Sequence, residues 1–251
     1  MIDLNKPSTQ IDISIPLQFN GPQPNAYGVE AATSKACEAG DIVGDTRRGG
    51  SVNFEQYTFI PHCNGTHTEC VGHITDERIS VLDCLTDFVV AAVLVSVEPV
   101  NVDGGDLVIT HSSLQAASVG TAADTPTALI VRTLPNDDSK LTRQYGEQYI
   151  PPYFTAEAMK YLVECGFKHL LVDMPSIDRI FDEGKLVNHR IFWNVEPGSR
   201  EINAATRMES TITELIYVPN EFADGEYLLN LQIAPFVADC SPSRPMLMGI
   251  I

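Results

Sequence analysis

Three short aliphatic runs limit the fold of this chain more than any other feature of its sequence. Residues 88–97, 128–132 and 169–172 are rich in β-branched or aliphatic side chains and are bounded by Asp, Pro or Gly. Continuous apolar runs of this length are typical of strands that are covered on both faces. The sequence therefore predicts a central sheet that contains these three strands.

One helix is predicted between the second and third of these runs. Thr155 can cap its first turn, Met159, Leu162 and Val163 share one face, and Gly166 follows its end. An amphipathic helix in this place packs naturally on a sheet.

Weaker patterns add further elements. Ser112 can cap a short helix that reaches about residue 117. Turn signals occur at Asp224-Gly225 and at Ser241-Pro242. Alternating or β-branched runs predict strands at 11–17, 56–60, 212–218, 227–235 and 246–250. Strands outnumber helices, so we expect a mixed α/β fold.

Size and charge set limits on partners. A chain of 251 residues, 44% of them hydrophobic, without a linker-like segment or repeat predicts one domain over 1–251. Sixteen basic against 33 acidic residues give a net charge of −17, so nucleic acid and membrane surfaces are not expected as partners. Residues 1–6 lack the features of a secretion signal, so we expect a cytoplasmic protein whose six cysteines are reduced.

A histidine cluster is the strongest chemical signal. His62, His67 and His73 lie within twelve residues, together with Cys63 and Glu69, and these side chains are metal ligands. Cys63, His67, Glu69 and His73 have the same parity and could face one side of extended chain on either side of a turn at Gly65. Spacing alone leaves open a surface loop with chance histidines.

The cluster resembles the signature of a known family. Gly65, Thr66, His67 and His73 match the pattern His-x-Gly-Thr-His-x-Asp-x-x-x-His of the cyclase family, metal-dependent hydrolases that include kynurenine formamidase and isatin hydrolase. The resemblance implies the family's swivelling β/β/α domain and a homo-oligomer. It also implies that His67 binds metal and that His73 is the catalytic acid/base.

Two positions depart from the family pattern. Cys63 stands where the family has its first histidine, with His62 one place upstream as the alternative, and Glu69 replaces the aspartate. Both replacements can bind a divalent metal, and a sulfur ligand favours zinc over manganese. A one-residue slip to His62 would restore nitrogen and oxygen ligands.

Resemblance continues beyond the cluster. Residues 173–178 and 238–244 are similar to family segments, and the family implies His189 and Glu214 as ligands of a second metal. The gap between these two residues is longer than the family leads us to expect. Ser176 and Asp178 are expected to shape a turn.

The other polar and sulfur side chains are more simply interpreted as structural residues. Cys70 is expected to be a packing residue. Arg244 could bind a substrate carboxylate or pair with a nearby acid. His111 and His169 have no partner motif, so no role is predicted for them.

Together these features predict a metal-dependent amidohydrolase of the arylformamidase type. A divalent metal, zinc or alternatively manganese, would lower the pKa of a water toward about 7 for attack on a small N-formyl or cyclic amide. His73 would pass a proton to the departing nitrogen, since an imidazole can accept or donate near neutral pH. The alternative is a non-catalytic metal- or small-molecule-binding relative that keeps the fold.

Overall fold

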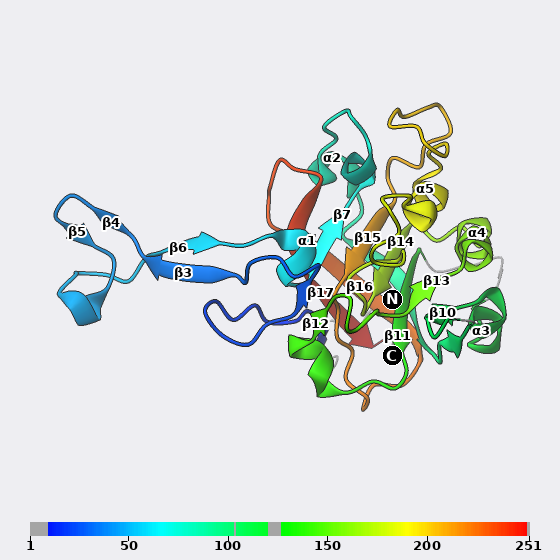
Figure 1. Ribbon diagram of the computed structural model, residues 1–251, viewed down its shortest axis with the longest axis horizontal. Helices are drawn as coiled ribbons and strands as arrows, with labels where there is room; N and C mark the ends of the chain where they lie inside the picture. The colour runs from blue at the N-terminus through cyan, green and yellow to red at the C-terminus, as the bar shows by residue number, and fades with distance from the viewer. Residues whose placement is uncertain (1–9, 103, 120–126, 250–251) are drawn as a thin grey trace.

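A computed structural model describes residues 10–102, 104–119 and 127–249 (Figure 1). None of the helices in this part of the chain is long and apolar enough to cross a membrane. The elements in chain order are β1 (Gln10–Asp12), β2 (Asn25–Ala26), β3 (Thr33–Ala36), β4 (Glu38–Ala39), β5 (Ile42–Val43), η1 (Thr46–Arg48), β6 (Glu55–Thr58), α1 (Pro61–Asn64), β7 (His67–Glu69), η2 (Val71–Ile74), α2 (Val81–Cys84), β8 (Val89–Val97), β9 (Val100–Asn101), β10 (Leu107–Ile109), α3 (His111–Ala116), β11 (Ala128–Thr133), η3 (Asp138–Thr142), β12 (Gln144–Tyr145), β13 (Tyr153–Phe154), α4 (Ala156–Glu164), β14 (His169–Val172), α5 (Val187–Trp193), β15 (Thr211–Glu214), β16 (Gly225–Ile233) and β17 (Cys240–Gly249).

The main sheet closes on itself. Its order is β1-β17-β16-β8-β11-β14-β15-β7, and β7 also pairs with β17, which makes a ring of seven strands with β1 attached beside it. Strands β8, β11, β14 and β15 are parallel, whereas β16, β17 and β7 pair antiparallel with their neighbours. The predicted central sheet and mixed α/β fold are confirmed.

Alternate residues of the parallel strands enter two separate cores. On β11, Leu129 and Val131 join the cluster that contains Met159 of α4 and Phe192 of α5. Ile130 joins a second cluster on the opposite face, with residues of β1, β16 and β17. The prediction that these strands are covered on both faces is therefore confirmed for β11 and β14, whereas Val89 and Ala91 in the first half of β8 are exposed.

Helix α4 begins and ends as predicted. The Thr155 hydroxyl accepts a hydrogen bond from the backbone N–H of Ala158 at 3.2 Å. Met159 and Leu162 are fully buried, and Gly166, just beyond the helix, has a φ of +86° that favours glycine.

Two local predictions were wrong. Thr110, not Ser112, caps α3, because its hydroxyl accepts the N–H of Ser113 at 3.0 Å. Ser241-Pro242 is not a turn but lies within β17. There β17 changes partner, since residues 240–242 pair with β7 and residues 243–249 pair with β16.

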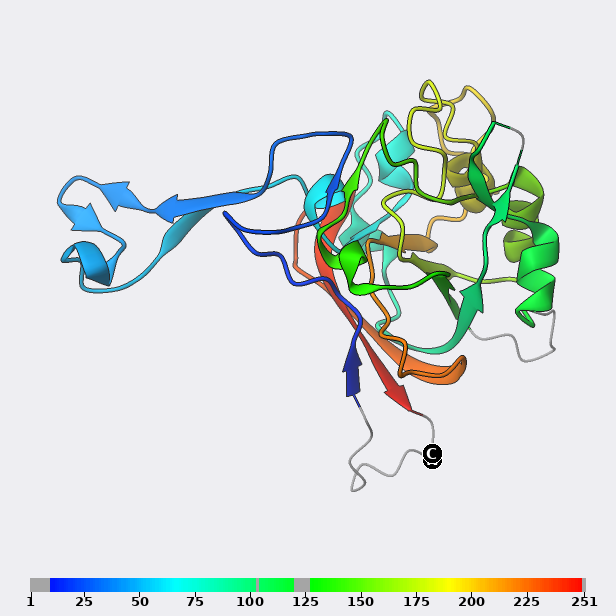
Figure 2. The same ribbon diagram turned by 60° about the horizontal axis from the view of Figure 1, so that its bottom comes forward.

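An extended arm projects from the body between residues 33 and 58 (Figures 1 and 2). Strand β3 pairs with β6 along the arm, and β4 pairs with β5 near its tip. All four residues of β6 are exposed, in contrast to the buried strands of the main sheet. The strand predicted at 56–60 corresponds to β6.

Candidate metal centre

Strand β7 carries the centre of the site. It is hydrogen-bonded on both edges, to β15 and to β17, so the backbone of His67 and Glu69 is held firmly. His62 precedes it on the short helix α1, and His73 follows it on η2. The prediction of extended chain on either side of Gly65 was therefore wrong at its two ends, because residues 61–64 form α1 and residues 71–74 form η2. The chain is extended at Gly65, in β7 and at Cys70, and the histidines meet through the helical turns on either side.

A buried group of three side chains forms across the pairing of β7 with β15. Glu214 lies directly opposite His67 in the register of these strands. His67 Nε2 is 3.6 Å from Glu214 Oε2. The ligand atoms of His67, Glu69 and Glu214 lie within 4.8 Å of one another, and all three residues are buried.

His67 is arranged as a neutral ligand. Its Nδ1 lies 3.0 Å from the carbonyl oxygen of Gly65, which must accept, so Nδ1 carries the proton and Nε2 is left with a free lone pair. That Nε2 is buried without a hydrogen-bond partner among the described residues. Burial lowers the pKa of His67 to about 4, which keeps the ring neutral at pH 7.

His189 reaches the same centre from α5. Its Nε2 is 3.0 Å from Glu69 Oε1, and its Nδ1 is 2.6 Å from Asp178 Oδ2. Asp178 also accepts the backbone N–H groups of Asn188 at 2.7 Å and of His189 at 3.2 Å. Burial opposes protonation of His189, but hydrogen bonds to Asp178 and Glu69 raise its pKa well above the usual value. A carboxylate behind a histidine in this way is a common support for metal ligands.

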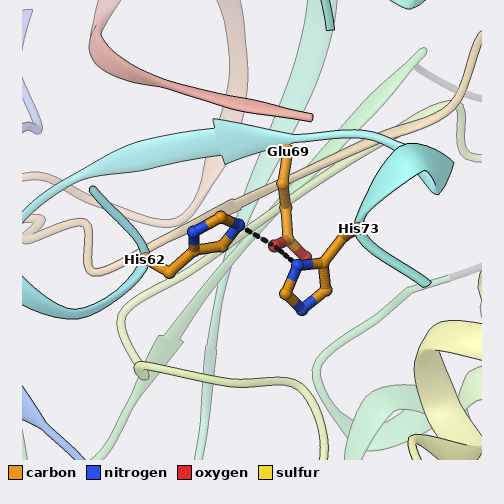
Figure 3. Close-up of side chains that lie close together, drawn as sticks. All are labelled: His62, Glu69 and His73. Atoms are coloured by element: carbon orange, nitrogen blue, oxygen red, sulfur yellow. Dashed lines mark ion pairs between the residues drawn. The ribbon is translucent and has the colours of Figure 1, made fainter. Parts of the chain in front are cut away.

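A second group consists of His62, Glu69 and His73, which Figure 3 shows close together, and its two histidines are partly exposed. Glu69 Oε2 lies 3.6 Å from His62 Nε2 and 3.8 Å from His73 Nδ1, and these ligand atoms also fall within 4.8 Å of one another. The side chains of His62 and His73 are 26% and 29% exposed, and their rings stack at 4.6 Å. Glu69 is thus shared by a buried group and an open group.

Two residues that sequence reasoning left without a role complete the open group. Asp239 Oδ2 is 3.1 Å from His62 Nε2 and 3.4 Å from His73 Nδ1. Cys240 Sγ is 3.2 Å from His62 Nδ1. Cys240 lies opposite Glu69 in the register of β17 with β7, which brings both residues to the site. In the sequence, the one signal for these two residues was the similarity of residues 238–244 to a family segment.

The charges of the site require compensation. Burial and the nearby charge of Glu69 raise the pKa of Glu214 well above the usual value. Burial acts in the same direction on Glu69, but His73, His189 and His62 together lower its pKa. Buried carboxylates beside a free imidazole lone pair fit a divalent cation, and nitrogen and oxygen donors suit zinc or manganese.

Cys63 lies outside these groups. It packs in an apolar cluster with Ile15 and Leu215, and it belongs to none of the metal-capable groups found among the described residues. Burial, then the charge of Glu214, raise the pKa of its thiol to about 11, which disfavours a thiolate ligand. Of the two alternatives for the first ligand, the structure brings His62 to the site.

The remaining residues singled out in the sequence lie away from the site. Cys70 is fully buried in the core, as expected for a packing residue. Arg244 Nε is 2.7 Å from Asp12 Oδ2, which matches the ion-pair interpretation. His169 is buried and hydrogen-bonds through Nδ1 to the Thr211 hydroxyl at 2.8 Å.

Comparisons with known proteins bear on the family and the fold. A family model described as "Putative cyclase" matches residues 11–179. No curated protein sequence matches the chain.

Several solved structures resemble the chain over nearly its whole length. A predicted metal-dependent hydrolase from Bacillus stearothermophilus has 13% identity and a TM-score of 0.62, covering 97% of this chain and 99% of that one. Isatin hydrolase A from Labrenzia aggregata has 14% identity and a TM-score of 0.62, with coverage of 96% and 93%. The Ralstonia solanacearum isatin hydrolase A has 15% identity and a TM-score of 0.62, with coverage of 96% and 92%.

Proposed function

Since the chain belongs to the cyclase family, we propose that it is a metal-dependent hydrolase that cleaves the C–N bond of a small N-formyl or cyclic amide. The single observation that carries this proposal is the sharing of Glu69 between a buried group and an open group of metal-capable side chains. The buried group can retain a cation, and the open group can meet a substrate.

The proposed metal ligands come from both groups. His67, Glu69, His189 and Glu214 would hold the metal, with His62 in the place considered for Cys63. A bound metal supplies Lewis-acid polarisation of the amide carbonyl and a water of lowered pKa. Zinc and manganese both suit these nitrogen and oxygen donors, since the sulfur ligand that would favour zinc is not at the site.

The chain's own residues would manage the protons. Water adds to the amide carbonyl carbon, the C–N bond breaks, and the departing nitrogen takes up a proton as the acyl half leaves as a carboxylate. His73 is exposed enough to touch substrate and would move that proton. Asp239, 3.4 Å from His73 Nδ1, would orient its ring.

The test is metal content followed by turnover. Purified wild-type protein and His67→Ala would be compared by elemental analysis, and N-formylkynurenine hydrolysis would be measured with and without a chelator. We expect stoichiometric metal in the wild type, loss of metal in His67→Ala, and turnover that the chelator abolishes.

A matched control is His111→Ala, which removes a histidine of α3 and should keep both metal and turnover. Wild-type protein that holds no metal after supplementation would overturn the proposal. Metal binding without hydrolysis of any small amide would instead support the non-catalytic alternative.

A further inference from the structure

A pocket opens beside the solvent-facing half of the metal centre. Its volume is about 570 Å³. His73 and Asp239 form part of its wall, so it adjoins the atoms that would meet a substrate. The lining residues are Gly72, His73, Thr75, Asp76, Arg78, Ile79, Ser80, Val237, Ala238 and Asp239.

Of the charged side chains on the pocket wall, Arg78 has no ion-pair partner among the described residues. Asp239 faces His62 and His73, and Asp76 Oδ1 lies 3.7 Å from Arg200. Arg78 is the cation of the wall, and it takes part in none of the ion pairs or side-chain hydrogen bonds found within residues 10–102, 104–119 and 127–249. Its guanidinium is therefore free to bind an anion.

The loop that carries Arg78 is held in place relative to His73. A Cβ on Gly72 would approach the carbonyl oxygen of Ile79 to 2.2 Å, so the two ends of the loop pack directly on each other. The Thr75 hydroxyl bonds the carbonyl oxygens of Val71 at 3.3 Å and Glu77 at 2.9 Å. Arg78 is thus attached to the same rigid turn as the proposed acid/base.

We propose that this pocket binds the amine half of the substrate and that Arg78 recognises a carboxylate on it. The inference rests on the proposed function and narrows its substrate class to amides whose amine half is anionic. A planar guanidinium matches a carboxylate with two parallel hydrogen bonds. One cation suits a single negative charge, and the acids at Asp76 and Asp239 disfavour a doubly charged phosphate.

A pair of matched substrates tests the inference. Metal-loaded wild type and Arg78→Gln would be assayed with 3-formamidobenzoate and with formanilide, which lacks the carboxylate. We expect Arg78→Gln to lower kcat/KM for 3-formamidobenzoate by about tenfold, mainly through KM, and to leave formanilide unchanged, since one exposed charge-assisted contact is lost. Arg78→Lys should recover part of the difference.

Arg48→Gln is the control, because it removes an exposed arginine of the arm, which pairs with Glu38 and is not part of the pocket wall. Equal effects of Arg78→Gln on both substrates would overturn the inference and leave the proposed function standing. If the metal-loaded wild type hydrolyses neither of these amides nor N-formylkynurenine, the proposed function fails. Calorimetric binding of benzoate to wild type and Arg78→Gln then decides whether the pocket holds an anion.

Discussion

The two halves of the candidate site use similar side chains in opposite surroundings. The buried half contains His67, His189 and Glu214, all with at most 4% of the side chain exposed. In the open half, the side chains of His62, His73 and Asp239 are 26–36% exposed. Glu69 belongs to both.

In the proposed function, burial, more than residue type, separates the side chains that hold the metal ion from the one that reacts. Burial keeps His67 neutral, and a low local dielectric strengthens the attraction of Glu214 and Glu69 for a cation. His73 in the open half is exposed enough to reach a substrate and exchange protons with water. Three substitutions test this division between the two halves.

The largest effect is expected from His73→Asn. Loss of the acid/base should lower kcat by about 10²- to 10⁴-fold while metal content stays unchanged, because the buried half is intact. Steady-state kinetics beside elemental analysis measure both quantities. His111→Asn is the matched control, and full activity of His73→Asn would show that the open half does not carry the proton transfer.

Asp178→Asn should act on the buried half. It removes the charge behind His189 while an amide oxygen can still accept a backbone N–H, so we expect metal affinity to fall by about 10- to 100-fold. Competition with a coloured chelator measures the affinity. Glu183→Gln, an exposed change on the same loop, should have no effect. Unchanged affinity in Asp178→Asn would mean that His189 does not hold the metal.

The smallest effect is expected from Asp239→Asn. Burial lowers the pKa of His62, but Asp239 and Glu69 outweigh it and raise that pKa. Removal of the Asp239 charge favours the neutral ring, so the pKa of His62 should fall. NMR titration of the metal-free protein measures the shift, with Asp76→Asn as control. A pKa of His62 that stays constant would argue against the contact with Asp239.

Local signals in the sequence were sufficient for the buried strands and for α4. Each depends on a pattern within about ten residues, such as the apolar run of β11 or the cap at Thr155. The cap of α3 was misplaced because Thr110 and Ser112 are both good caps, and only the fold selects between them. Pro242 gave a turn signal, but it marks the place where one strand passes between two partners.

The site was only partly accessible to sequence reasoning. The family signature pointed to residues 62–73, to His189 and to Glu214, and the structure brings these segments together. The contacts of Asp178 and Asp239 depend on tertiary register, which no local pattern encodes. The parity argument did not place Cys63 correctly, because it assumed that the chain is extended there, whereas Cys63 lies in the helical turn α1.

The double pairing of β7 has a consequence for how the protein reaches its native state. Contacts between β7 and β17 join residues about 170 positions apart, and such distant pairings form slowly. Glu69, which belongs to both groups of the site, lies where β7 pairs with both neighbours. It is opposite Ile212 of β15 on one edge and Cys240 of β17 on the other. An ion bound there would stabilise only chains in which the ring of strands has closed. Ion binding would therefore follow the last step of folding and could be used to measure it.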